Sequence, residues 1–310
     1  MIDPQRGVPG RIEMAVRLSI GLLAVSSGAI LIRLAGGEAP DLAIAFWRLA
    51  IAAAVFLAIA GFRGGLSRMS RSSILWSLAS GLALALHFSL WVASLRMTTV
   101  ASSTLFVGIH PAIVALGAIV FLKERPSKRL ALAIVVTLVG GAIIGAADVR
   151  LEGPNGLGDL MAAGGGVMAA VYFLIGRHVR RTVPLPEYAA LTYGSAALLV
   201  AAVSLCTGTN LLGFSGSTYG TLILLSIGPQ LIGHSTFNWA LRHLDASRVS
   251  ILVLGEPIGA SILAFALFGE RPGWSNMMGA VIILLGIYLS LGRTEEVDHG
   301  RTQDRRASED

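Results

Sequence analysis

The sequence places two ionisable residues at matching positions inside long apolar segments. His110 and Glu256 lie 146 residues apart, and each directly precedes a proline, Pro111 or Pro257. Ionisable groups at bilayer depth are costly and usually face a bundle interior or a water-filled path. An imidazole and a carboxylate brought together could form a protonation-dependent ion pair, which is the chemistry of proton coupling. In the alternative interpretation both residues are structural, and Glu256 either caps backbone N–H groups freed by the proline or pairs with Arg48.

A second group of polar residues follows Pro229. Gln230, His234 and Asn238 are spaced four apart, so they would share one face of an α-helix. We interpret this stripe as cavity lining, and the alternative is a hydrogen-bond ladder between helices. Pro229, like the two prolines above, removes a backbone hydrogen bond, so the helices are expected to bend there and to act as gates.

His87 and Trp91 form a further pair at helical spacing. An imidazole beside an indole suits a ligand with an apolar or aromatic body and a polar handle. Tyr172 and Phe106 are additional cavity candidates from other apolar segments. Arg48 could neutralise Glu256, hold a substrate carboxylate or extend toward the membrane surface, and we interpret it mainly as a structural or charge partner.

Other functional classes find little support in the sequence. No Gly-Lys-Ser/Thr phosphate loop is present, so ATP is not the expected energy source. There is one cysteine, no Cys/His cluster with metal-ligand spacing and no Ser-His-Asp constellation, so we expect no metal, no cofactor and no enzyme activity. The basic residues are dispersed between apolar segments, which argues against nucleic acid as a partner.

The elements that must position these residues repeat along the chain at an offset of 146 residues. Each repeat holds five apolar segments, and this odd number would make the second copy enter the membrane from the opposite side. Hydrophobic residues make up 54% of the chain and charged residues only 14%, as expected for a membrane protein. Matched positions include Leu95-Arg96 with Leu241-Arg242, Pro40 with Pro186, and Asp41 with Glu187.

Ten apolar runs have roughly the 20 residues that a membrane-crossing helix needs. The sequence therefore predicts an all-α polytopic membrane protein of ten transmembrane helices, built as two inverted five-helix repeats. The expected domains are residues 15–148, residues 156–292 and a disordered cytoplasmic tail, 293–310. The predicted spans are 17–35, 41–61, 73–95, 98–122, 128–148, 156–176, 187–206, 217–241, 245–269 and 274–292.

The distribution of basic residues predicts the orientation of the chain. Of the 24 lysines and arginines, 19 fall on one side of the predicted spans and four on the other, with Arg48 inside a span. Cytoplasmic loops carry an excess of Lys and Arg. We therefore expect both termini in the cytoplasm of a bacterium and the chain in its inner membrane. The first apolar run lacks a small-residue cleavage site, so we interpret it as a retained helix rather than a signal peptide.

The two halves also share an extended motif. It reads Pro111-(x12)-Glu124-Arg125-Pro126-(x13)-Gly140 in the first half, and Pro257, Glu270-Arg271-Pro272 and Gly286 recur at the same spacing in the second. This pattern resembles the EamA-type repeat of the drug/metabolite transporter superfamily over about residues 15–292, with amino-acid and metabolite exporters of the YddG type as the nearest general match. The resemblance implies a ten-helix exporter whose central cavity is lined by spans one, three, four, six, eight and nine. It does not identify the substrate.

Taken together, we expect a secondary active transporter that exports amino acids or related small amphiphilic metabolites by alternating access. Its expected partners are a small-molecule substrate and the lipid bilayer, with proton coupling as one option and the oligomeric state open. A drug or cationic-compound exporter of the same fold is the nearest alternative, with Glu256 as the cation partner. A lipid flippase is the alternative from another class, and it would need a lateral opening between helices.

Overall fold

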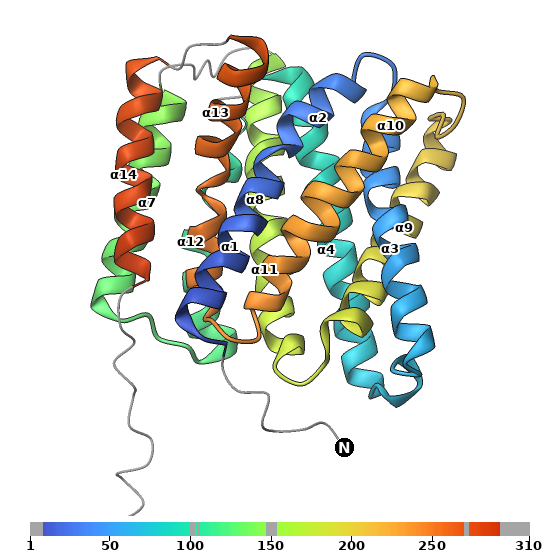
Figure 1. The fold of residues 1–310 in the computed structure, drawn as a ribbon, viewed down its shortest axis with the longest axis horizontal. Helices are drawn as coiled ribbons and strands as arrows, with labels where there is room; N and C mark the ends of the chain where they lie inside the picture. Colours follow the sequence, from blue (N-terminus) through green and yellow to red (C-terminus); the bar gives the residue numbers. More distant parts are fainter. Residues whose placement is uncertain (1–8, 99–102, 104–105, 147–153, 270–272, 292–310) are drawn as a thin grey trace, which may run out of the picture.

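The structure is a computed structural model that describes residues 9–98, 103, 106–146, 154–269 and 273–291. Within these ranges the chain forms helices and turns, without a strand. The predicted tail 293–310 and the second Glu-Arg-Pro motif, 270–272, lie outside the described residues. Helices α1 to α14 run roughly along one direction and form a bundle, and the start of α1 and the end of α14 lie at the same end of it (Figure 1).

In the part of the chain that the structure describes, six helical segments are long and apolar enough to cross a membrane: Arg11–Ala35, Asp41–Phe62, Arg71–Met97, Gly156–Arg180, Leu185–Thr207 and Ala246–Leu267. His110–Leu122 and Trp274–Ser290 are shorter apolar helices. The elements are α1 (Arg11–Ser26), α2 (Gly28–Ala35), α3 (Asp41–Phe62), η1 (Leu66–Arg68), α4 (Arg71–Met97), α6 (His110–Gly117), η2 (Ala118–Leu122), α7 (Lys128–Ala146), α8 (Pro154–Arg180), α9 (Leu185–Thr207), α10 (Gly216–Leu225), η3 (Ser226–His234), α11 (Ser235–Ala240), α12 (Ala246–Val253), α13 (Glu256–Phe268) and α14 (Trp274–Ser290).

Local sequence chemistry accounts for the helix ends. The hydroxyl oxygens of Ser70 and Ser215 accept hydrogen bonds from backbone N–H groups in the first turns of α4 and α10, at 3.1 and 3.3 Å. Such caps satisfy donors that a helix start leaves unpaired. Gly208 ends α9 and Gly269 ends α13, each in the left-handed region that glycine adopts without steric cost.

The helices pack in pairs that combine the two halves of the sequence. Helix α4 lies along α8, α3 along α9, and α7 along α14, and the last pair stands together at the left of Figure 1. Helix α1 packs against η3 and α11. A continuous apolar core runs between these pairs, with Phe88 and Phe237 among its most buried members.

Two glycines let α7 and α14 approach closely. A Cβ added to Gly140 would lie 2.8 Å from the carbonyl oxygen of Gly279, and one added to Gly286 would lie 3.0 Å from that of Ala133. Gly140 and Gly286 are 146 residues apart in the sequence, and so are Ala133 and Gly279. Each helix of the pair therefore uses the same repeat position to contact the same position of its counterpart.

The prolines of the motif coincide with interruptions of the helices. Pro111 and Pro257 each occupy the second residue of a new helix, α6 or α13. The residues that precede these helices, Ile109 and Gly255, share the same backbone angles, φ −72° and ψ −14°. Pro229 lies within η3, a π-helix. Helices broken at these points expose backbone groups at depth, which membrane proteins tolerate where a cavity or other protein surrounds them.

Candidate functional site

One large cavity, of about 650 Å³, lies inside the bundle. Residues from α2, α4, α6, α8, α12 and α13 line it, together with one or two residues near the ends of α3, α7, η3 and α14. The cavity reaches the end of the bundle where α2 and α4 end and α3 begins, because Arg33, Arg96 and Asp41 also line it. Its volume falls within the usual range for small-molecule sites. The predicted residues that line it are His87, Trp91, His110, Tyr172, His234, Glu256 and Pro257.

Helix α4 contributes the His87–Trp91 pair. The two rings are stacked, with centroids 6.0 Å apart and an interplanar angle of 10°. His87 Nδ1 lies 2.9 Å from the carbonyl oxygen of Gly165 on α8. A Cβ added to Gly165 would lie 3.4 Å from the backbone oxygen of His87 and 3.6 Å from the Trp91 Cβ, so glycine gives close packing at this point. The close contact between α4 and α8 holds both rings in the cavity wall.

His110 and His234 are held by aromatic neighbours. His110 stacks on Phe173 of α8 at 5.8 Å and 20°, and its Nδ1 lies 3.1 Å from the carbonyl oxygen of Val107. His234 meets the edge of the Phe88 ring at 5.4 Å and lies 6.4 Å from Tyr172. Together with His87, these residues give the cavity three imidazoles, each of which can donate or accept a hydrogen bond.

Glu256, the first residue of α13, contributes a carboxylate to the cavity and remains partly exposed. It lies within electrostatic range of Arg48. The ion pairs found among the described residues do not include one between Glu256 and His110, although both line the same cavity. In this conformation the two residues therefore line the same cavity without an ion pair among those found in the described residues.

Arg48 lies behind the wall rather than in it. Its side chain is 3% exposed, and its guanidinium lies 4.1 Å over the ring of Phe88. Its Nε donates a 2.7 Å hydrogen bond to Gln230 Oε1, which joins α3 to η3. A buried cation held by an amide and an aromatic face stabilises the local arrangement of helices. This placement favours the structural interpretation of Arg48.

The polar stripe after Pro229 divides between two environments. His234 lines the cavity, whereas Gln230 and Asn238 have no exposed surface. Asn238 Nδ2 donates hydrogen bonds to the hydroxyl oxygens of Tyr172 and Tyr193, at 2.5 and 2.9 Å. The spacing of four residues places side chains on one face only in an α-helix, and the π-helical η3 changes that register. Gln230 and Asn238 therefore form part of a buried polar network.

Sequence reasoning missed part of the lining and named three residues that are not among the lining residues, Phe106, Gln230 and Asn238. Phe106 is not among the lining residues, whereas its neighbours Val107 and Gly108 are. Phe173 was missed because an isolated phenylalanine in an apolar helix has no distinguishing signal. The mouth pair Arg96 and Asp41, which form an ion pair, could have been found, since both are charged residues at the ends of predicted spans. Among the described residues no group of His, Cys, Asp or Glu could hold a metal ion.

Apolar helices of membrane-crossing length around an internal cavity define a multi-pass helical membrane protein. The family model of the EamA-like transporter family matches residues 15–146 and again residues 156–292. The chain therefore belongs to the EamA-like transporter family, and the resemblance noted from the Pro and Glu-Arg-Pro motifs is confirmed.

Similar proteins carry the same general description. The uncharacterized transporter YyaM of Bacillus subtilis (strain 168) is 24% identical over 80% of this chain and 83% of its own length. An uncharacterized transporter of Archaeoglobus fulgidus is 24% identical over 90% of this chain and 97% of its own length. One solved crystal structure shares 19% identity with a TM-score of 0.76, covering 91% of this chain and 97% of that one, which shows a shared fold. The names indicate a transporter rather than an enzyme.

Proposed function

We propose that the protein is a secondary active transporter that exports amino acids or related small amphiphilic metabolites by alternating access. The observation that carries this proposal is the composition of the cavity. Glu256 offers a carboxylate to a substrate ammonium group. The three imidazoles can accept hydrogen bonds from the ammonium group when neutral, and His87 and His110, whose Nδ1 atoms face backbone carbonyl oxygens, donate to a substrate carboxylate when protonated. Trp91 and Phe173 offer aromatic surface to an apolar body.

The inverted-repeat arrangement is part of the proposal, with ten membrane-spanning segments divided equally between the halves. It is supported by the two family matches, by the reciprocal contacts of Gly140 and Gly286, and by the shared backbone angles of Ile109 and Gly255. Transporters of this architecture bind their substrate near the midplane, where the repeats meet and helices are broken. His110 and Glu256 each begin a helix at such a break.

The proposed location is a bacterial inner membrane with both termini in the cytoplasm. The 19 basic residues predicted for the cytoplasmic side support this orientation. Reporter fusions or cysteine labelling should place the Gly64–Gly65 turn inside and the turns at Gly37 and Gly213 outside. The opposite placement, or termini on different sides, would exclude the proposed topology.

A cation exporter of the same fold is the second candidate, and Glu256 is the observation that favours it. A carboxylate in an aromatic cavity also suits an organic cation without a carboxylate. The two functions differ in whether the substrate's own carboxylate matters. Matched pairs of an amino acid and its decarboxylated amine therefore distinguish them.

Efflux from proteoliposomes tests the function directly. Purified protein is reconstituted, loaded with radiolabelled amino acids or the matched amines, and followed with and without an imposed pH gradient. Export of amino acids above the rate of protein-free liposomes is expected, and acceleration by the gradient would indicate proton coupling. Export of the amines alone would favour the cation exporter. Absence of export for both classes under both conditions would contradict the proposal.

A further inference from the structure

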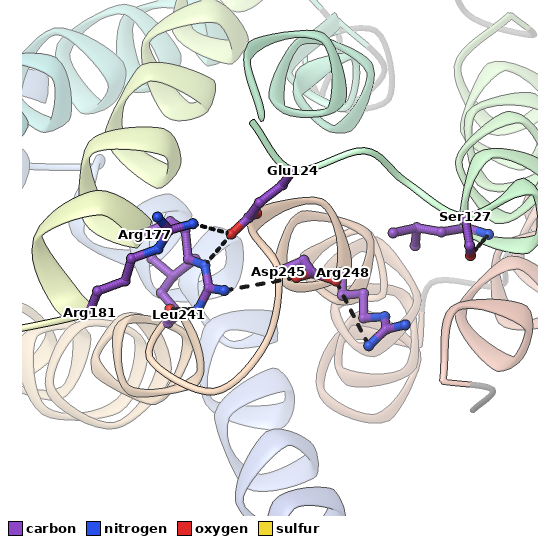
Figure 2. Close-up of polar contacts among 8 residues, drawn as sticks. Glu124, Ser127, Arg177, Arg181, Leu241, Asp245 and Arg248 are labelled. Carbon is purple, nitrogen blue, oxygen red and sulfur yellow. Dashed lines mark hydrogen bonds and ion pairs between the residues drawn. The ribbon is translucent and has the colours of Figure 1, made fainter. Parts of the chain in front are cut away.

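A cluster of charged residues lies at the end of the bundle opposite the cavity mouth. Figure 2 shows its members, Glu124, Arg177, Arg181, Asp245 and Arg248, which we name the Glu124 cluster. Glu124 Oε1 accepts from the Nε of Arg177 at 2.7 Å and from a terminal nitrogen of Arg181 at 2.6 Å. Asp245 lies 3.8 Å from nitrogens of both Arg177 and Arg248.

The contacts between α4 and α8 identify the end of the bundle at which the Glu124 cluster lies. Near the mouth, a Cβ on Gly158 would lie 2.9 Å from backbone atoms of Met97 and Thr98, where α4 ends. At the other end, Trp76 near the start of α4 contacts His178, with ring centroids 5.6 Å apart. His178 is the neighbour of Arg177, so the Glu124 cluster lies where α4 begins and α8 ends.

The cluster joins the same helices that line the cavity. Glu124 follows η2, which continues α6, and the two arginines that bind it stand at the end of α8. Arg177 also donates a 2.8 Å hydrogen bond to the carbonyl oxygen of Leu241, in the turn between α11 and α12. Between this cluster and the cavity, buried apolar side chains such as Val114 and Val249 fill the space.

We propose that the Glu124 cluster is a latch that holds the cytoplasmic end of the transporter closed while the cavity is open to the outside. This inference rests on the alternating-access function proposed above. For the cavity to open to the cytoplasm, α6 and η2 must separate from α8 and from the turn before α12. Glu124 binds Arg177 and Arg181 at the end of α8, and Arg177 in turn contacts Leu241 and Asp245 in the turn before α12. These contacts must therefore break in each transport cycle.

The environment of Glu124 gives its ion pairs strength. The side chains of Glu124 and Arg177 are only 16% and 14% exposed, so solvent and salt screen their attraction less than at an open surface. One carboxylate also binds two arginines, both at the end of α8. Its removal would break both ion pairs between the end of η2 and α8, which favours separation of these helices.

The backbone next to Glu124 adds a second component. Lys123 has φ +59°, and it is the only non-glycine residue with positive φ among those the structure describes. It follows the π-helical turn η2, and its repeat counterpart 146 residues later, Gly269, has φ +70°. A left-handed lysine is strained where glycine is not. The latched state therefore stores strain at Lys123, which lowers the barrier to release.

Cysteine accessibility in membrane vesicles of known orientation tests the latch without any substrate. The full chain carries Cys206→Ala and one reporter: Ser250→Cys, in the buried layer below the cavity, or Ser261→Cys, in the cavity wall. A membrane-impermeant thiol reagent is applied from one side at a time. Glu124→Gln should raise labelling of the Ser250 reporter from the cytoplasm about fivefold and lower labelling of the Ser261 reporter from outside.

Two matched variants complete the design. Glu13→Gln removes an exposed ion pair with Arg17, in the first helix, and should leave both reporters unchanged. Lys123→Gly relieves strain in the latched state, so it should lower cytoplasmic labelling of the Ser250 reporter roughly threefold. Unchanged labelling in both Glu124→Gln and Lys123→Gly would overturn the latch. Shifted labelling in a protein that exports no amino acid would leave the latch standing and contradict only the proposed substrate.

Discussion

Replacing Asn238 by leucine is expected to destabilise the protein through the loss of two identified hydrogen bonds. The amide nitrogen of Asn238 donates to Tyr172 and to Tyr193, and the side chain has no exposed surface. Tyr193 also contacts the hydroxyl of Ser235 at 3.2 Å, so it keeps one partner after the substitution. Tyr172, which lines the cavity, loses its shortest hydrogen bond.

The magnitude follows from the number and burial of these bonds. Hydrogen bonds between side chains in membrane proteins contribute about 0.6 kcal/mol on average and up to about 1.7 kcal/mol. Two such bonds give an expected loss of about 1 to 3 kcal/mol for Asn238→Leu. Tyr172→Phe removes one of the same bonds, so the double variant should be more stable than the sum of the single losses predicts, by about 0.6 to 1.7 kcal/mol.

Unfolding of the purified protein in detergent measures this coupling through a double-mutant cycle. The control cycle combines Asn238→Leu with Tyr219→Phe, because Tyr219 accepts its hydrogen bond from Gly213 in the turn before α10. That pair shares no partner and should be additive within about 0.5 kcal/mol. Additivity of Asn238→Leu with Tyr172→Phe as well would refute the network that the structure assigns to these residues.

Three further predictions follow from the structure. Glu256→Gln should strongly weaken export in proteoliposomes and flatten the pH dependence of export, and His110→Gln should give a milder defect. Normal export by Glu256→Gln with an unchanged pH profile would contradict a role of Glu256 in proton coupling. Gly140→Ala should cost about 1–3 kcal/mol of stability, because the new Cβ would meet the backbone of α14. The control Gly141→Ala, whose Cβ would have nothing within 4 Å, should not destabilise the helix. Equal melting temperatures for the two variants would contradict this packing. Hydrogen bonds from Thr218 and then Ser215 lower the pKa of Glu38, so its stabilising effect is present above the ordinary carboxyl pKa and is lost as pH falls through the lowered value. Glu38→Gln should remove this acid-dependent part of thermal unfolding.

The sequence predicted much of the helical organisation because hydrophobic length and repeated motifs are local signals. The segment predicted at 41–61 is α3, and the one predicted at 128–148 begins α7 at the expected residue. The same reasoning treated 217–241 as one α-helix with a bend at Pro229, whereas the chain forms α10, the π-helix η3 and α11 there. A change from α to π geometry depends on tertiary packing around Pro229, which hydropathy does not report.

In the candidate site, too, the features that depend on local sequence could be predicted, and those that depend on tertiary packing could not. His110 and Glu256 were predicted as cavity residues because they are ionisable residues in apolar segments, and the free-energy cost of a charge in a membrane does not depend on the fold. His234 lines the cavity while Gln230 is buried, and this difference depends on which helix covers each side of η3. The spacing of residues in the sequence does not predict that packing. Arg48 illustrates the point further, since its burial behind Phe88 is fixed by α4 and η3 together.

If the two halves are the inverted repeats proposed above and exchange conformations during transport, the equivalent positions of His110 and Glu256 have a mechanistic consequence. Both residues begin a helix after the same backbone turn, yet in this state His110 is 3% exposed and stacked on Phe173, while Glu256 remains open to the cavity. An exchange of conformations would open the His110 position and enclose that of Glu256. An enclosed carboxylate must be protonated or paired, so the transition would change the proton occupancy of this position unless Arg48 pairs with Glu256. The two positions follow the same backbone turn but carry different side chains, and this difference is what the proposed coupling of proton movement to the cycle would use.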